Sequence, residues 1–326
     1  TLLAQYAQNS RVRTLVDTRE IWIVPLLNPD GHVYQSETQQ RPGWRKNRRP
    51  IDGEPVGVDL NRNYSYAWGF AEEGSSGEPL SETYRGAAAF SEPETQVLRA
   101  LVERQRFTIA VSYHSFGKLV LFPWGHTRAS VTPDHAVFVA MADSMVRDNG
   151  YRPGNAYTGA IYLTNGVWDD FMYGELYGAK EHRTMAFTVE LNAGTEGGFW
   201  PPEDLIEPTC AAMWTLNLYA LRVAGELDAV LPPAAPVLLA AQNAADPRRI
   251  DRIATVVPRS ILDERDQLFV VAARPQLPED AADGPHDIQI LHLGVAADVV
   301  RLPRTSAREH RADRGAVIAD VEPVAY

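Results

Sequence analysis

Residues 108–114 read Thr-Ile-Ala-Val-Ser-Tyr-His, an almost continuous apolar run that ends in a histidine. A short run of this kind is typical of a strand that is buried on both faces of a sheet. The segments 20–27 (EIWIVPLL) and 185–191 (MAFTVEL) have the same character and predict two further buried strands. In open α/β sheets, ligands bind outside the carboxyl ends of such strands, which is where His114 would lie.

Helical patterns are found before, between and after these strands. Ser91-Glu92-Pro93-Glu94 fits a capping box with Ser91 as the N-cap. The apolar side chains of Val97, Leu98, Leu101 and Val102 would then form one face of the helix that follows. The remaining expectations are helices over 2–16, 133–148 and 208–226, a short strand over 119–122, a turn at 28–31 (NPDG), and a short helix opened by Asp169 and Asp170.

Composition limits the classes of function. The 326-residue chain has a formal net charge of −11, which argues against general nucleic-acid binding. It has no apolar run of the roughly 20 residues needed to span a bilayer. Cys210 is its one cysteine, which excludes an intrachain disulfide and a thiolate metal cluster.

The composition changes at residues 231–236 (LPPAAP), which predict a stiff linker. We therefore divide the chain into a large first domain over residues 1–230 and a small β-rich accessory domain over residues 237–326. Within the second part, residues 267–273 and 288–293 have strand-like patterns.

Positive charge gathers ahead of the octapeptide GVDLNRNY at residues 57–64. Residues 41–49 contain five cations, which fits either a solvated loop or a surface that handles anions. In the octapeptide, Asn61 stands beside Arg62, and a guanidinium grips a carboxylate through two parallel charge-assisted hydrogen bonds. A solvated arginine in a turn is the alternative.

Glu190 is a carboxylate within the apolar run 185–191. Burying such a group is costly unless it is paired or bound to a metal. A structural salt bridge is one interpretation, and a working acid or base is the other.

Several motifs occur together in one order: NPDG, GWRKNR (43–48), GVDLNRNY, SETYRG (81–86), SYHSFGKLVLFPWG (112–125), the segment 162–174, and FTVEL followed by GFWPP (198–202). Their order and spacing resemble the zinc carboxypeptidases of the carboxypeptidase A type, especially the bacterial members. The resemblance covers about residues 1–225. It implies an α/β/α fold around a mixed sheet, eight-stranded in that family, with one zinc ion per catalytic domain.

The resemblance also implies roles in catalysis. His114 corresponds to the last of three zinc ligands, and Glu190 to the general base that takes a proton from the zinc-bound water. Arg45, in the tripeptide WRK, resembles the arginine that polarises the scissile carbonyl and stabilises its oxyanion.

Four further positions are implied to bind the substrate, the C-terminus of a peptide or protein. Asn61 and Arg62 resemble the pair that holds the terminal carboxylate, and Tyr162 resembles the tyrosine that closes over it. Asp169 falls where the family places a residue at the floor of the specificity pocket, an Asp in members that favour Lys or Arg. A helix cap is the alternative for Asp169.

The main departure from the family concerns the metal ligands. The other two ligands of the family come as His-x-x-Glu ahead of the first buried strand, and none of the eight histidines here has Glu three residues on. We therefore expect a chain that begins after this motif and that, as given, is inactive and binds zinc poorly. Phe116, where many relatives have Tyr, is a smaller departure.

Two alternatives to the metallocarboxypeptidase hypothesis stay open. One is a zinc-free module that binds peptide C-termini without cleaving them, and the other is a cell-wall peptidase or amidohydrolase on the same fold. A secreted or periplasmic location follows from the resemblance alone.

Overall fold

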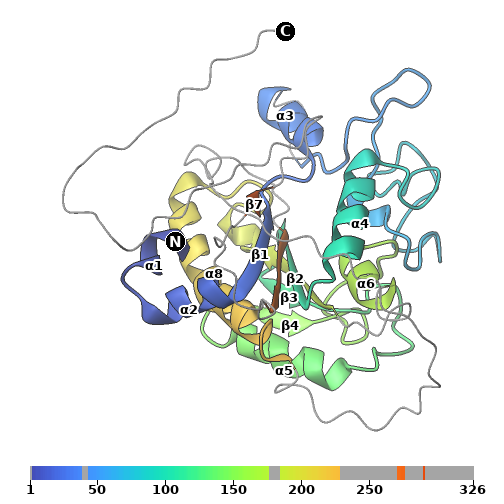
Figure 1. The fold of residues 1–326 in the computed structure, drawn as a ribbon. Coiled ribbons are helices and arrows are strands. Elements are labelled where there is room, and N and C mark those ends of the chain that lie inside the picture. The colour runs from blue at the N-terminus through green and yellow to red at the C-terminus, as the bar shows by residue number, and fades with distance from the viewer. Residues whose placement is uncertain (1, 39–42, 176–183, 228–269, 276–288, 291–326) are drawn as a thin grey trace.

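The computed structural model describes residues 2–38, 43–175, 184–227, 270–275 and 289–290, and within them a seven-stranded sheet forms the centre of the molecule (Figure 1). The strands lie in the order β4-β3-β5-β2-β6-β1-β7. Their bounds are β1 (Arg19–Val24), β2 (Ile109–Ser115), β3 (Leu119–Leu121), β4 (Arg152–Gly154), β5 (Met185–Leu191), β6 (Val270–Pro275) and β7 (Gln289–Ile290).

The sheet is mixed. β2 pairs in parallel with β5 along its whole length, and this register places His114 directly beside Glu190. β3 runs antiparallel to β5 and parallel to β4. The two long parallel strands therefore bring their carboxyl ends to the same edge of the sheet, as the sequence predicted for His114.

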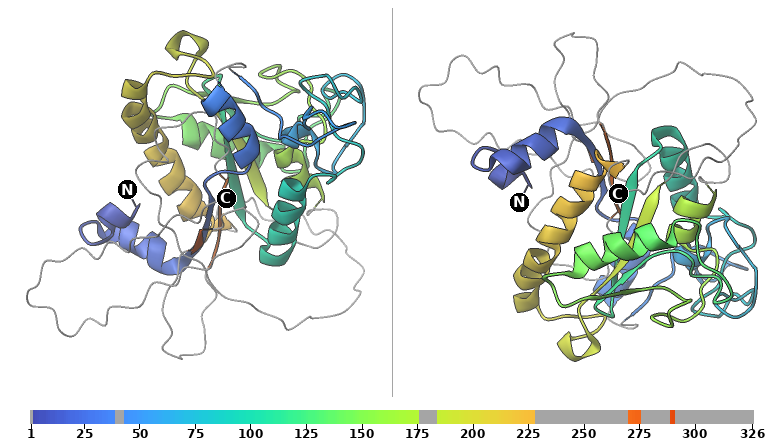
Figure 2. Two further views of the ribbon diagram at one scale, coloured as in Figure 1. Left: turned by 90° about the horizontal axis from the view of Figure 1, so that it is seen from above. Right: turned by 90° about the horizontal axis from the view of Figure 1, so that it is seen from below.

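Helices cover both faces of the sheet (Figures 1 and 2). One apolar core joins Val111 and Phe187 of the sheet to α2 (Ser10–Thr18), α5 (His135–Val146) and α8 (Ile206–Val223). A second core joins Ala110 and Ala186 to α4 (Pro93–Gln105) and α6 (Trp168–Asp170). Successive residues of β2 and β5 thus enter opposite cores, which explains their continuous apolar runs and confirms the three-layer α/β/α architecture.

The N-terminal segment differs from the single predicted helix over residues 2–16. It forms α1 (Leu2–Tyr6) and α2, because the Asn9 side chain accepts hydrogen bonds from the Arg11 and Val12 backbone N–H groups and caps a new helix. The turn predicted at residues 28–31 is also wrong, since α3 (Pro29–Thr38) begins there. Proline suits the first turn of a helix, and the Asn28 side chain accepts from Gly31 N at 3.0 Å.

The predicted capping box does not form at α4. Glu92 is the N-cap, without a side-chain cap hydrogen bond, and the Ser91 hydroxyl donates to the Glu92 carboxylate at 2.7 Å instead. Leu98, Leu101 and Val102 are buried as predicted, but the Val97 side chain is 43% exposed. The predicted short strand and the helices at α5, α6 and α8 are confirmed, with bounds that differ by a few residues.

The strands predicted near residues 267–273 and 288–293 exist as β6 and β7, but in a different place. β6 lies inside the main sheet, antiparallel to both β1 and β2, and β7 pairs in parallel with β1. They were expected in a separate β-rich domain. The linker at residues 231–236 and the remainder of 237–326 lie outside the described residues, so the division of the chain at residue 230 stays a prediction.

Remaining short elements are the 3-10 helices Leu60–Arg62, Gly194–Glu196 and Glu203–Leu205 and the π-helix Phe171–Glu175. Across the described ranges, no helix combines the length and the apolar character that crossing a membrane requires.

Candidate active site

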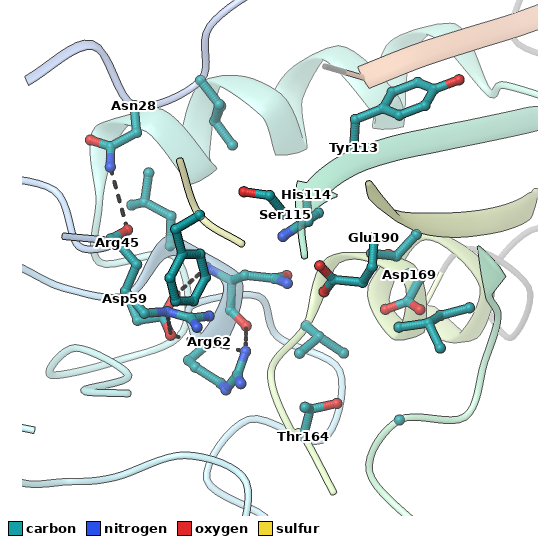
Figure 3. A pocket seen from close by; sticks show the side chains of 18 of the residues that line it. Asn28, Arg45, Asp59, Arg62, Tyr113, His114, Ser115, Thr164, Asp169 and Glu190 are labelled. Carbon is teal, nitrogen blue, oxygen red and sulfur yellow. Dashed lines mark hydrogen bonds and ion pairs between the residues drawn. The ribbon is translucent and has the colours of Figure 1, made fainter. Parts of the chain in front are cut away.

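A pocket opens at the carboxyl ends of β2 and β5 (Figure 3). Segments from distant parts of the chain meet there, including the loops that follow α3 and β4. The side chains that the sequence singled out all line this one pocket: Arg45, Asn61, Arg62, His114, Tyr162, Asp169 and Glu190. The structure therefore brings the predicted site residues together.

His114 is held near the end of β2 by its neighbour on the same side of the strand. The Ser112 hydroxyl lies 2.9 Å from His114 Nε2, which leaves Nδ1 as the ring nitrogen that could bind a metal. Burial, together with the charge of Arg45, lowers the pKa of His114 to about 3. The imidazole is therefore neutral at physiological pH, which is the form that binds metal ions.

Glu190 lies beside His114, on β5. Its Oε2 is buried and has no hydrogen-bond partner among the described residues. Burial raises the pKa of Glu190 to about 7, although the positive charges of Arg45 and Arg62 oppose the shift. The salt-bridge alternative is not met in the described part of the chain, where Arg45 pairs with Asp59. A carboxylate with a pKa near neutrality is suited to accept a proton.

Arg45 and Arg62 form the opposite, cationic wall of the pocket, on either side of Asp59 (Figure 3). Arg45 Nε lies 2.9 Å from Asp59 Oδ2, and Arg62 Nη1 lies 3.9 Å from the same oxygen. The charge of Asp59 is the main cause that raises the pKa of Arg45. Asp59 is itself only 2% exposed, so one buried anion holds two cations in place.

Arg62 is held by backbone carbonyls. Its Nε donates to Gly74 O at 2.6 Å and its Nη1 donates to Asn61 O at 2.7 Å. Burial lowers the pKa of Arg62, while Asp59 opposes that change. Because an arginine stays charged even so, the structure presents a fixed, desolvated guanidinium to the pocket.

Asn61 has a second task besides lining the pocket. Its Oδ1 accepts a hydrogen bond from Trp168 N at 2.9 Å, at the start of α6. The oxygen of the amide is therefore engaged in positioning the loop that carries Asp169, and its NH₂ group is the part suited to a substrate carboxylate.

The remaining two predicted residues differ in exposure. Tyr162 is 56% exposed and stands at the rim of the pocket, whereas Asp169 is 7% exposed within it. Burial and the neighbouring charge of Asp170 raise the pKa of Asp169 to about 7. Asp170 is held by three donors: Gly125 N, His126 N and His126 Nδ1. Asp169 also accepts from Asp170 N at 3.2 Å, but it lies within α6, whose N-cap is Val167, so the helix-cap alternative is not met.

Sequence reasoning missed two parts of the site. It gave no role to Asp59, although this aspartate stands inside the octapeptide that was singled out. It also left open a solvated loop around Lys46, whose ammonium group is instead buried and donates to Pro79 O at 2.8 Å and Ser81 O at 3.0 Å. This anchoring, with the Asn28 amide donating to Lys46 O at 3.1 Å, fixes the backbone next to Arg45.

The described residues fit one ligand position of a zinc site and do not complete it. A catalytic zinc ion needs about three protein ligands. Among these residues, no group of three or more His, Cys, Asp or Glu side chains could hold a metal ion. His114, which is neutral and oriented by Ser112, has the properties of one such ligand.

Two solved structures have a similar fold. Thrombin-activatable fibrinolysis inhibitor matches with a TM-score of 0.57 and 26% sequence identity, over 68% of this chain and 55% of that one. The bovine form, in complex with tick carboxypeptidase inhibitor, matches with a TM-score of 0.52 and 28% identity, over 60% of this chain and 66% of that one. These likenesses place the chain in the metallocarboxypeptidase fold class.

The sequence comparison is more specific. Residues 1–216 match the zinc carboxypeptidase family, and the chain belongs to that family. It is 34% identical to "Zinc carboxypeptidase A 1" of Anopheles gambiae and 35% identical to "Zinc carboxypeptidase" of Simulium vittatum. Each match covers 62% of this chain, and the chain spans 47% and 66% of these two relatives.

Proposed function

We propose that the protein is a zinc-dependent carboxypeptidase that removes the C-terminal residue of peptides or proteins. One observation carries this proposal. A fixed arginine, Arg62, and the carboxylate of Glu190, which keeps an oxygen without a partner among the described residues, line the same pocket as His114 (Figure 3). An exopeptidase needs this combination, because it must bind a terminal carboxylate and activate a water molecule a short distance away.

Each residue then has a distinct task. Arg62, with the amide of Asn61, binds the terminal carboxylate, and Tyr162 covers it from the rim. Arg45 binds the carbonyl oxygen of the scissile bond and stabilises the negative charge that develops on it. Glu190 accepts the proton of the attacking water and passes it on to the leaving amine. Zinc, held in part by His114, would supply an acidified water and a second positive charge next to the carbonyl.

Asp169 gives the pocket a preference for basic C-terminal residues in this proposal. It is buried, it lines the pocket together with Gly125, and it is ionised above a pH of about 7. A lysine or arginine side chain would pair with this carboxylate. A secreted or periplasmic location rests on the family resemblance alone.

The test compares peptides that have a free C-terminal carboxylate with the same peptides amidated. We expect the intact protein to cleave only the free acids, and Arg62→Ala to lose about 10- to 100-fold in kcat/KM for them, since a charge-assisted hydrogen bond is worth roughly 1.5–3 kcal/mol. Equal cleavage of both forms would indicate an endopeptidase or an amidase instead. Tight binding of free acids by a zinc-loaded protein that does not cleave them would favour a peptide-binding module.

A further inference from the structure

The orientation of Arg62 depends on a loop that contributes little to the pocket itself. Arg62 is 1% exposed, and its Nε donates to Gly74 O at 2.6 Å. Since Nε lies in the plane of the guanidinium, this bond fixes the direction in which the two terminal nitrogens point. The place of the Gly74 carbonyl therefore sets the direction of the charged fork.

Gly74 is pressed against the segment that follows Tyr162. Its φ of +100° lies in a region that favours glycine. A Cβ at this position would come within 2.8 Å of Leu163 O and 2.9 Å of Thr164 Cα. The two loops are in direct backbone contact, which leaves the Gly74 carbonyl little freedom to move.

A single side chain, Asn165, ties the two loops together on both sides of Gly74. Its Nδ2 donates to Ala71 O at 3.0 Å and to Glu73 O at 2.9 Å, and its Oδ1 accepts a short hydrogen bond from the Ser75 hydroxyl. Asn165 and Ser75 are 2% and 1% exposed. Both N–H donors and the oxygen of the amide are thus engaged in the dry interior, where a lost partner is costly.

We propose that Asn165 is a positioning residue for Arg62: by holding residues 71–75 it fixes the Gly74 carbonyl, and through it the guanidinium that receives the substrate carboxylate. This inference rests on the proposed function, in which Arg62 is the carboxylate anchor. Asn165 follows Tyr162 by three residues, so one loop carries both the rim tyrosine and the residue that orients the arginine.

The test measures binding rather than turnover. The chain is titrated, in the presence of a chelator, with a blocked dipeptide that ends in a free carboxylate and with its C-terminal amide. The Nε–H resonance of Arg62 is followed by NMR, because its hydrogen bond to Gly74 should shift it downfield and protect it from exchange.

Two variants weaken the hydrogen bonds between Asn165 and residues 71–75 by different amounts. Asn165→Asp keeps the shape but replaces two donors by a charge that faces two carbonyls. We expect about tenfold weaker binding of the free acid, unchanged binding of the amide, and faster exchange of the Arg62 Nε–H. Ser75→Ala removes one hydroxyl and should give the same pattern at about threefold, which keeps the test valid if the first variant does not fold.

The control is Asn149→Asp, the same change at an asparagine beyond the end of α5. There the amide donates to Met145 O at 2.9 Å and accepts from Tyr151 N at 3.1 Å. We expect no effect on the affinity for either peptide.

Arg62→Ala tests the proposed role of Arg62 separately from the positioning role of Asn165. If it removes the preference for the free acid while Asn165→Asp and Ser75→Ala keep it, the inference about Asn165 is overturned alone. If Arg62→Ala itself keeps the preference, the proposed role of Arg62 fails first. Equal loss of affinity for both peptides in Asn165→Asp would make Asn165 a merely structural residue, which also overturns the inference.

Discussion

The two walls of the pocket bury charge in opposite ways. On the cationic wall, Arg45 and Arg62 flank the buried carboxylate of Asp59; ion pairs with this carboxylate hold both, and hydrogen bonds to backbone carbonyls also hold Arg62. On the opposite wall, Glu190 keeps a buried oxygen without a partner among the described residues, and Asp169 lies next to another carboxylate. Pairing preserves charge on the first wall, and desolvation raises the affinity for protons on the second.

This difference matches two kinds of work. A group that recognises a fixed charge in the substrate must be charged and rigid before the substrate arrives, which the buried partners of Arg62 ensure. A group that moves a proton needs a pKa near the working pH, which burial without a partner provides for Glu190. Substitutions of the carboxylates on the second wall should therefore change catalysis and its pH dependence. Removal of the anionic partner on the first wall should change stability.

The largest effect is expected from Glu190→Gln in the intact protein. The change preserves the shape of the side chain and removes its basicity, so kcat should fall by at least about 100-fold, the scale of general-base catalysis. Steady-state kinetics on a free-acid peptide measure this loss. Binding of the peptide should persist, because Arg62 is untouched.

Glu103→Gln is the matched control for this variant. Glu103 lies on α4, its side chain is 38% exposed, and it pairs with Arg99 at 2.8 Å. No change of rate is expected there. A Glu190→Gln protein that retains both its zinc and its rate would show that another group accepts the proton.

A second large effect concerns selectivity and its dependence on pH. Because the pKa of Asp169 is raised to about 7, this side chain is mostly neutral below that pH and ionised above it. The attraction for a basic C-terminal residue requires the ionised form, so the ratio of kcat/KM for Arg over Phe should rise between pH 6 and pH 8. Asp169→Asn should lower kcat/KM for Arg about tenfold and flatten this dependence, with little change for Phe.

A pH-independent ratio in the unsubstituted protein would show that Asp169 does not set this preference and would leave it only its hydrogen bond from Asp170 N. Muropeptides assayed beside the linear peptides test the cell-wall alternative. If the protein is a cell-wall peptidase, the muropeptides should be the better substrates.

The fold could be predicted from the sequence where burial of a strand produces a simple apolar pattern. β2 and β5 alternate between two apolar cores, so their sequences are apolar at nearly every position and identify them as buried strands. β6 could not be placed in this way, because a strand pattern does not say which sheet a strand joins. The capping box at Ser91 failed because Glu92 is the N-cap of α4, and the Ser91 hydroxyl oxygen accepts a hydrogen bond from the Asn63 amide instead of from the helix.

The site residues likewise fall into two groups, those that a sequence motif identifies and those that it does not. Arg45, Arg62 and His114 stand in motifs, and a resemblance points to them directly. Asn165 has no such signal, because the carbonyls that it holds lie 94 and 92 residues earlier in the chain. Every residue has a backbone carbonyl, so the residue type does not reveal such a contact. It is found only in the three-dimensional structure.

The cationic wall is weakened by Asp59→Asn. The variant leaves Arg45 and Arg62 close together without the anion between them, and we expect the free energy of unfolding to fall by on the order of 1–3 kcal/mol. Chemical denaturation at neutral pH measures this. Glu72→Gln is the control, because Glu72 pairs with Arg85 at 2.5 Å but is 70% exposed, and solvent screens such a pair so that its loss should change stability little. Equal losses in the two variants would contradict the buried role of Asp59.

The smallest effect is expected from Tyr162→Phe, at the exposed rim. The side chain is 56% exposed, and the buried Arg62 guanidinium that its hydroxyl contacts keeps its hydrogen bonds to Gly74 O and Asn61 O, so stability should change little. At this exposed rim water competes for the carboxylate, so we expect the hydrogen bond to contribute only about 0.5–1.5 kcal/mol, which predicts a KM for free-acid peptides that rises by about three- to tenfold with kcat nearly constant. The amidated peptide, which offers no carboxylate, should bind equally to both proteins. A fall in kcat at constant KM would instead place the Tyr162 hydroxyl at the scissile bond. Tyr162 would then take part in the chemical step together with the residues of the two walls.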